Sequence, residues 1–224
     1  MDKETDLSPD IREVVRYLGY HGVFPDDTVL NEIQECIRDL QACVTPRFVY
    51  ERFPLSASKA PDGVPLLCFD ELEIRSRDLA KNLEDCSGVY LMAVTLGPGP
   101  DRLIRRASVS RMSRAVILQA AAAAMTEVWC DRINERIRLE ADRDGLYTRP
   151  RFSPGYGDLP LDLQKDISRI LNMPKEIGVS LTQTLLMTPS KSVTALIGLS
   201  EKPGICRKRG CEDCEASENC PYRA

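Results

Sequence analysis

The residues with the most distinctive chemistry lie in segment 151–157, which reads Arg-Phe-Ser-Pro-Gly-Tyr-Gly. Its Pro-Gly pair excludes regular helix or strand, because proline lacks an amide donor and glycine favours turns. Arg151 offers a planar fork for a carboxylate, bare backbone around Gly155 can approach a ligand, and Tyr156 supplies a ring face with a polar tip. The segment is a candidate small-molecule site. A structural turn with a surface ion pair explains the same residues about equally well.

A row of carboxylates lies upstream of this segment, within a long predicted helix. Glu127, Asp131 and Glu135 recur every four residues, a spacing at which like charges destabilise a helix slightly. One interpretation is that solvent or nearby basic side chains offset the repulsion. The arginines available for this are Arg132, Arg136 and Arg138. The other interpretation is that one or more of the carboxylates face a cationic ligand.

Four of the nine cysteines crowd into the end of the chain, at Cys206, Cys211, Cys214 and Cys220. Four thiolates suffice for a metal site, either structural zinc or a [4Fe–4S] cluster, and the spacing does not discriminate between them. Lysines and arginines between the cysteines favour thiolates. The alternative is a tail of free thiols. The other five cysteines have apolar neighbours and are expected to be inert core residues.

Composition narrows the class of protein. The chain has 224 residues with 43% hydrophobic and 29% charged residues, which is ordinary for one large globular domain. A net charge of -4 gives no support to a nucleic-acid or anionic-membrane partner. The start of the chain is acidic and polar, and no apolar run is long enough for a membrane span. We therefore expect a cytoplasmic location, reduced thiols and no membrane partner. His21, the single histidine, is expected to be structural or at the surface.

The elements that must position these residues are helices and strands in no regular order. Apolar periodicity predicts helices over residues 8–17, 27–43, 76–83, 108–141 and 161–171. Alternating or continuous apolar runs predict strands over residues 47–55, 66–74, 89–96 and 191–199. Basic residues between 102 and 114 are expected on a solvated helix face. Because helices do not alternate strictly with strands, the pattern favours an α+β fold over a doubly wound sheet.

Taken together, these segments resemble the activation domain of cobalamin-dependent methionine synthase. The resemblance is strongest in residues 91–97, 134–138 and 151–195, where Arg-x-x-Pro-Gly-Tyr precedes Ile-Gly-Val-Ser-Leu-Thr at 177–182. It implies a helical, C-shaped α+β domain with a central antiparallel sheet over residues 1–199. Residues 200–224 would form a separate cysteine-rich tail. No match is found for the segment that supplies a further tyrosine to the family's site.

The resemblance also implies a ligand, S-adenosylmethionine, bound in a shallow groove. Arg151 matches the arginine that grips its carboxylate, and Tyr156 matches the tyrosine beside it. Ser153 falls where the family uses main-chain atoms, in the same turn as Gly155, and Glu135 matches a glutamate of the helix that lines the groove. The carboxylate row would then face the sulfonium and ammonium of this ligand.

The function implied is that of an activation protein acting in trans. It would dock on a cobalamin-binding methionine synthase that lacks its own activation domain, and an electron donor would reduce cob(II)alamin before methyl transfer. Two alternatives remain open. One is an electron-transfer accessory of a corrinoid enzyme that does not bind S-adenosylmethionine. The other is an interaction subunit that docks through a face of the long helix rich in small residues, among them Ala120, Ala121 and Ala124.

Overall fold

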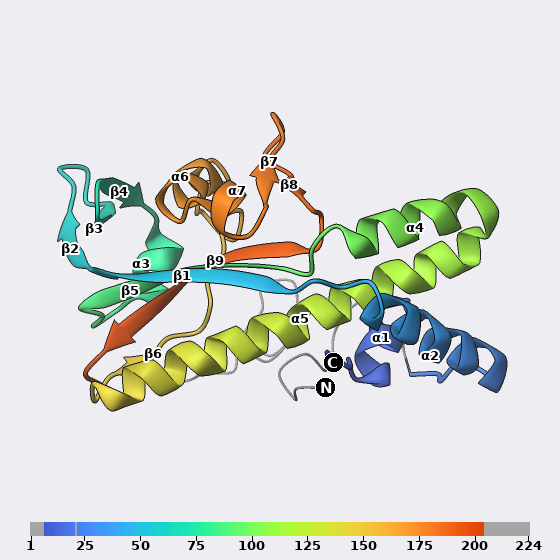
Figure 1. Ribbon diagram of the computed structural model, residues 1–224. Coiled ribbons are helices and arrows are strands. Elements are labelled where there is room, and N and C mark those ends of the chain that lie inside the picture. Colours follow the sequence, from blue (N-terminus) through green and yellow to red (C-terminus); the bar gives the residue numbers. More distant parts are fainter. Residues whose placement is uncertain (1–6, 21, 204–224) are drawn as a thin grey trace.

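A four-stranded antiparallel sheet forms the centre of the protein (Figure 1). The computed structural model describes residues 7–20 and 22–203. The sheet has the order β1-β5-β9-β6. Its strands are β1 (Arg47–Pro54), β5 (Gly88–Thr95), β9 (Ser192–Ser200) and β6 (Tyr147–Thr148). The strands predicted at 47–55, 89–96 and 191–199 are confirmed, and so is the α+β class with a central antiparallel sheet.

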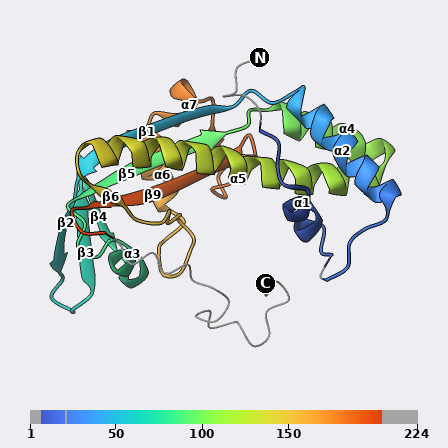
Figure 2. The same cartoon turned by 90° about the horizontal axis from the view of Figure 1, so that it is seen from below.

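Helices cover both faces of this sheet. The long helix α5 (Met112–Arg143) runs across one face, and α6 (Leu163–Ile170) and α7 (Met173–Glu176) lie on the other (Figures 1 and 2). Successive residues of a strand point to opposite faces, so β5 and β9 are buried throughout. Met92 and Ile197 pack toward α5, whereas Leu91 and Leu196 pack toward α6. Two apolar clusters therefore sandwich the sheet.

Three further helices surround the first half of α5. They are α1 (Ile11–Tyr17), α2 (Asp27–Gln41) and α4 (Gly99–Ser110). The long helix predicted over residues 108–141 is confirmed from Met112 onward, but its start was wrong, because the backbone at Arg111 is extended (φ -155, ψ 91) and separates α4 from α5. After β5 the chain turns at Gly97, which has φ 77, and α4 begins at Gly99. The predicted start of the first helix was also early, since Asp10 caps it by accepting from Arg12 N.

A smaller three-stranded sheet lies at one end of the molecule (Figure 1). It comprises β2 (Ser56–Lys59), β3 (Pro65–Phe69) and β4 (Leu72–Arg75). The single strand predicted at 66–74 was wrong, because Asp70 adopts φ 51 and turns the chain between β3 and β4. Helix α3 (Arg77–Asn82) follows and confirms the helix predicted over residues 76–83; Ser76 caps it, with its Oγ accepting from Leu79 N at 3.0 Å. A two-stranded hairpin, β7 (Ser180–Leu181) and β8 (Met187–Thr188), precedes β9.

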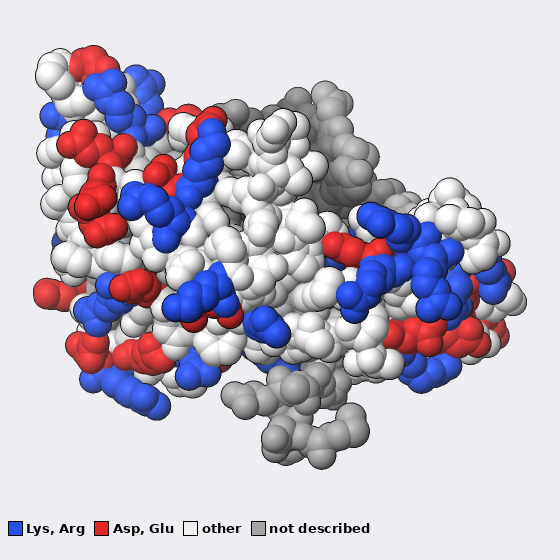
Figure 3. All heavy atoms as spheres, turned by 45° about the horizontal axis from the view of Figure 1, so that its top comes forward, with Lys and Arg blue, Asp and Glu red and all other residues white. Residues whose placement is uncertain are grey.

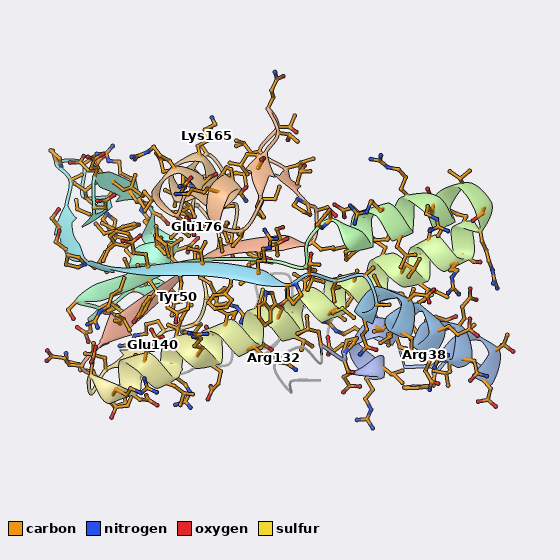
Figure 4. All side chains as sticks on the ribbon, in the orientation of Figure 1. Arg38, Tyr50, Arg132, Glu140, Lys165 and Glu176 are labelled. Carbon is orange, nitrogen blue, oxygen red and sulfur yellow. The ribbon has the colours of Figure 1, made fainter. Side chains whose placement is uncertain are left out.

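Polar contacts join the layers. Tyr50 of β1 donates a hydrogen bond to Glu140 of α5, and the two side chains point toward each other in Figure 4. Trp129 Nε1 of the same helix donates to the carbonyl of Arg47 at 3.0 Å. These bonds tie the outer strand of the sheet to α5.

Basic side chains gather over the end of the molecule that contains α4, with acidic ones beside them (Figure 3). Arg102, Arg105 and Arg106 are exposed on α4, as predicted for a solvated face. Arg114 differs: it is partly buried against α2, where its Nη2 lies 2.6 Å from a carboxylate oxygen of Asp39. In the described part of the chain, no helix combines the length and the apolarity required to cross a membrane. His21 and the four C-terminal cysteines lie outside the described residues.

Candidate functional site

Segment 151–157 leaves the sheet beside β9. Phe152 N donates to the carbonyl of Leu196 at 2.9 Å, and Leu196 N donates to the carbonyl of Phe152 at 2.8 Å. The chain then turns, with Tyr156 N bonded to the carbonyl of Ser153 at 3.2 Å and Gly155 at φ 91. A side chain at that φ would be strained, so glycine suits position 155. The irregular turn predicted from the Pro-Gly pair is confirmed.

A groove of about 460 Å³ opens beside this turn, at the outer edge of β9. Its volume lies within the range of about 300–1,000 Å³ that small-molecule sites occupy. The turn contributes Arg151, Phe152, Ser153, Pro154 and Tyr156. The other lining residues are Glu127 of α5, Gln164 of α6, Met187 of β8, and Ser192, Val193 and Thr194 of β9. Three predicted site residues, Arg151, Ser153 and Tyr156, therefore share one groove, and Gly155 lies in the turn between the last two.

Arg151 is held by two carboxylates of α5. Its Nη1 lies 2.8 Å from Oδ1 of Asp131 and its Nη2 lies 3.3 Å from Oε2 of Glu127. The arginine side chain is 23% exposed, so it lies partly sheltered at the wall of the groove. A guanidinium beside carboxylates complements an α-amino acid, whose carboxylate and ammonium need a donor and an acceptor side by side. The arrangement can therefore orient a zwitterionic ligand.

Glu135 lies apart from these residues. Its carboxylate pairs with Arg138 at 2.6 Å, and the hydrogen bond from Arg138 lowers the pKa of Glu135. It does not line the groove in the described structure, whereas Glu127 does. The carboxylate row is thus divided: Arg151 compensates its first two members and Arg138 its third. The sequence analysis included Glu127 in the carboxylate row but did not single it out. The three carboxylates differ only in their tertiary contacts, because Arg151 reaches Glu127 and Asp131 but not Glu135.

Three buried polar side chains, Gln164, Ser192 and Thr194, line the groove, and two of them have an atom without a partner in the described structure. Gln164 is 7% exposed and Thr194 is 2% exposed. Neither Gln164 Oε1 nor Thr194 Oγ1 has a hydrogen-bond partner among the described residues. Leaving a buried polar atom unpaired costs about 1–3 kcal/mol, so such atoms in a groove indicate a place for a polar ligand. No motif marked these two residues in the sequence.

Tyr156 stands at the mouth of the groove with 69% of its surface exposed. Burial of so large a ring is normally favourable, and its exposure beside a groove leaves the ring face available for stacking. Met187 of β8 also lines the groove and adds an apolar surface. The rim is therefore apolar and the walls are polar, a common division in ligand sites.

The turn is anchored to the start of α3 by Asp158. Its carboxylate accepts from Arg77 N at 2.7 Å, from Asp78 N at 3.2 Å, and from the hydroxyl of Ser76. The hydrogen bond from Ser76, followed by those from backbone amides, lowers the pKa of Asp158. Next to it, Gly157 has φ 54, and a Cβ there would lie 2.2 Å from Oδ2 of Asp78. These contacts hold the turn in a single position.

A smaller pocket of about 380 Å³ lies on the other side of Arg151, between α1 and α5. Arg151 and Glu127 line both hollows, whereas Asp131 lines only the smaller one. The arginine and Glu127 thus form the partition between them.

One cysteine thiol lies close to the charged wall of the groove. The nearby thiol of Cys130 is buried, which raises its pKa to about 12 and keeps it protonated at neutral pH. Among the residues that the structure describes, no group of three or more His, Cys, Asp or Glu side chains is placed to hold a metal ion.

Comparisons with known proteins agree with this fold. The family model for the vitamin B12 dependent methionine synthase activation domain matches residues 79–203. A crystal structure of the MetH reactivation domain bound to AdoHcy is similar, with a TM-score of 0.61 and 19% sequence identity. That similarity covers 87% of this chain and 74% of the other. No curated protein sequence matches the chain.

Proposed function

Since the chain belongs to the family of vitamin B12-dependent methionine synthase activation domains, we propose that it binds S-adenosylmethionine in the β9 groove. There it presents the methyl group to cobalamin carried by a methionine synthase partner. The relative of known structure is bound to AdoHcy, the demethylated form of the same ligand, which supports a ligand of this class.

The residues of the groove divide the task of holding this ligand. Arg151 takes the carboxylate of the methionine moiety, and Glu127 accepts from its ammonium group. Main-chain atoms of the turn around Ser153 and Gly155 approach the ligand, and Tyr156 covers it from the mouth of the groove. Glu135 is placed one turn beyond Asp131, where it contributes to the charge of the helix face rather than to direct contact.

The chemistry requires no proton transfer by the protein. The bond between sulfur and methyl breaks with its electron pair going to sulfur, which leaves the neutral thioether, S-adenosylhomocysteine. Cobalamin on the partner, reduced from cob(II)alamin to cob(I)alamin by one electron from a separate donor, would supply the electron pair for the new bond between cobalt and the methyl group. This chain contributes proximity and orientation: a fixed amino-acid end at Arg151 determines where the methyl group points.

The single observation that carries the proposal is the position of Arg151, a family-matched arginine in the wall of a groove and beside two carboxylates. Titration calorimetry with S-adenosylhomocysteine tests it. We expect saturable binding that Arg151→Met weakens by ~10–100-fold, because a charge-assisted hydrogen bond contributes about 1.5–3 kcal/mol. Arg169→Met, which removes the same charge from an exposed position on α6, is the control and should bind normally. Absence of binding, or equal affinity in both variants, would refute the assignment.

For the C-terminal tail we propose a zinc or [4Fe–4S] site formed by Cys206, Cys211, Cys214 and Cys220. The proposal rests on the number and spacing of these cysteines. Metal content and the visible spectrum of anaerobically purified protein distinguish zinc from iron. A protein with iron but no affinity for S-adenosylhomocysteine would instead be an electron-transfer accessory of a corrinoid enzyme.

A further inference from the structure

Strand β1 forms the edge of the central sheet that lies away from the ligand groove. It pairs with β5 along its whole length, and no described strand lies beyond it. In an antiparallel ladder, alternate residues direct both N–H and C=O to the same side. Leu55 N donates to the carbonyl of Ser87 at 2.9 Å and continues the register of β1 with β5, so odd-numbered residues bond to β5. Phe48, Tyr50 and Arg52 therefore direct their backbone groups outward.

An open edge of this length is a template for pairing with another strand. Proteins commonly blunt such edges with proline, with bulges or by keeping the strand very short. In β1, which has 8 residues, the only proline is the last residue, Pro54, and the register with β5 contains no bulge. The half-buried centre of the strand, at Phe48, Val49 and Tyr50, is thus free of these devices.

Two side chains of opposite charge lie four residues apart on this edge. Arg47 and Glu51 are exposed, and neither forms an ion pair within the part of the chain that the structure describes. Because their spacing is even, both project from the same face of the sheet. It is the α6 face, since Val49 between them packs with the apolar cluster on that side. Charged side chains usually discourage edge pairing, but two of opposite sign favour a partner with the reverse order of charges.

We propose that β1 pairs with β1 of a second copy of this chain, antiparallel and about a two-fold axis at Val49. An antiparallel copy of the strand presents the two charges in the reverse order. Among the registers in which outward residues oppose outward residues, this one places Arg47 opposite Glu51 of the second copy, twice by symmetry. An axis at Tyr50 places Glu51 opposite Val49, and an axis at Glu51 sets the two glutamates against each other. The charge pairs fall at non-hydrogen-bonded positions, where side chains are closest.

The α5 face of the same edge is complementary in this register as well. Phe48 lies opposite Tyr50 of the second copy, and each such pair exchanges two backbone hydrogen bonds. Within one copy, Cζ of Arg136 lies over the Phe48 ring, 5.1 Å from its centroid, and Tyr50 donates to Glu140 (Figure 4). The pairing therefore brings Arg136 of each copy toward Glu140 of the other. The ligand groove beside β9 stays open, so the association does not depend on the proposed function.

Sedimentation velocity over a concentration series measures the association directly. We expect a reversible equilibrium between monomer and dimer that weakens as salt is added, because exposed charges are screened. Glu51→Arg should weaken the dimer by ~10–100-fold, since it replaces two attractive pairs by two repulsive ones. Glu73→Arg, which makes the same change of charge at an exposed position of β4, is the matched control and should dimerise like the wild type.

The double variant Arg47→Glu with Glu51→Arg exchanges the two charges and should restore dimerisation to within a few-fold of the wild type. Thermal unfolding of each variant checks that the fold is intact, as expected for exposed side chains. Hydrogen exchange provides a second readout, because the amides of Phe48 and Tyr50 should be protected as the dimer forms.

Wild-type protein that stays monomeric at every concentration would overturn the proposal. A dimer that Glu51→Arg does not weaken, or that the double variant does not restore, would do the same, because the copies would then meet elsewhere or in another register. Dimerisation without protection of the Phe48 and Tyr50 amides would also exclude β1 as the interface.

Discussion

Arg151 Nη1 lies 2.8 Å from Oδ1 of Asp131, an ion pair formed at the partition between two hollows of the surface. Glu127 completes the pair on the other side, with its Oε2 3.3 Å from Nη2. The two carboxylates are not equivalent, because Glu127 lines the ligand groove and Asp131 does not. Under the proposed function, Glu127 would contact the amino-acid end of the ligand, whereas Asp131 would only compete with the ligand carboxylate for the same guanidinium.

Neutralising these carboxylates one at a time should have opposite effects on binding. Asp131→Asn is expected to strengthen S-adenosylhomocysteine binding by ~2–5-fold, since an exposed ion pair that competes for Arg151 is worth about 0.2–1 kcal/mol. Glu127→Gln is expected to weaken binding by ~3–10-fold, because the ammonium loses a charged acceptor that remains partly screened by solvent. Titration calorimetry measures both changes.

Glu135→Gln serves as the control for this pair, because Glu135 is the next member of the same helical row and pairs with Arg138 instead. Its affinity should equal that of the wild type. If all three variants weaken binding by similar factors, the effect would be one of net charge and the distinction between Glu127 and Asp131 would be wrong.

A second prediction concerns Asp158, which joins the ligand turn to the first turn of α3. Asp158→Asn should lower the stability by ~0.5–1 kcal/mol, the lower part of the range for a helix cap, because the carboxylate is near solvent. Ligand affinity should fall with it, since the turn carrying Arg151 and Tyr156 loses its anchor. Chemical denaturation and calorimetry on the same sample provide the two values.

The pH dependence follows from the direction of the pKa shift. The pKa of Asp158 in the folded protein is lowered below its usual value of about 3.9 in an unfolded chain. The unfolded state therefore takes up the proton first, and the stabilisation is complete above about pH 4 and lost as the pH falls through the folded-state pKa. The difference in stability between wild type and Asp158→Asn should accordingly shrink on acidification. A difference that stays constant down to pH 3 would contradict the role given to this carboxylate.

The sequence predicted those elements that local signals define and missed those that depend on distant contacts. The helix predicted over residues 76–83 is an example of a local signal, because its cap, Ser76, acts over only three residues. The break at Arg111 has no proline or glycine at the break itself, and α4 folds back on α5 through packing that no local pattern records. The turn at Asp70 is similar, since a non-glycine residue adopts a positive φ within an apolar run.

The candidate site shows the same division. The turn from Arg151 to Tyr156 was predictable because Pro and Gly exclude regular structure and the neighbouring residue types have a distinctive chemistry. Gln164 and Thr194 were not, because each is an ordinary residue in its own element. Their significance arises only where α6 packs over β9 and leaves both polar atoms without partners.

A third prediction tests the close approach of α4 to the end of α2. A Cβ at Gly99 would lie 1.9 Å from the carbonyl oxygen of Cys43, a backbone atom that cannot rotate away. Gly99→Ala should therefore destabilise the fold by ~1–3 kcal/mol, as over-packing typically does, and lower the Tm by several degrees. Ser113→Ala, an exposed change on the neighbouring α5, should leave the Tm unaltered. A Tm for Gly99→Ala equal to that of the wild type would show that α4 can shift without cost.

The last prediction concerns Tyr156, which is 69% exposed at the mouth of the groove. A ring in that position contributes little to the folded core, so Tyr156→Ala should leave the Tm almost unchanged. It should nevertheless weaken S-adenosylhomocysteine binding by ~3–10-fold, because an aromatic contact adds about 0.5–1.5 kcal/mol beyond its buried area. Tyr156→Phe should retain most of the affinity if the ring face is what matters, and Tyr147→Ala, another exposed tyrosine, should have no effect on binding. If Tyr156→Phe loses as much affinity as Tyr156→Ala, the hydroxyl group and not the ring would be the part that contacts the ligand.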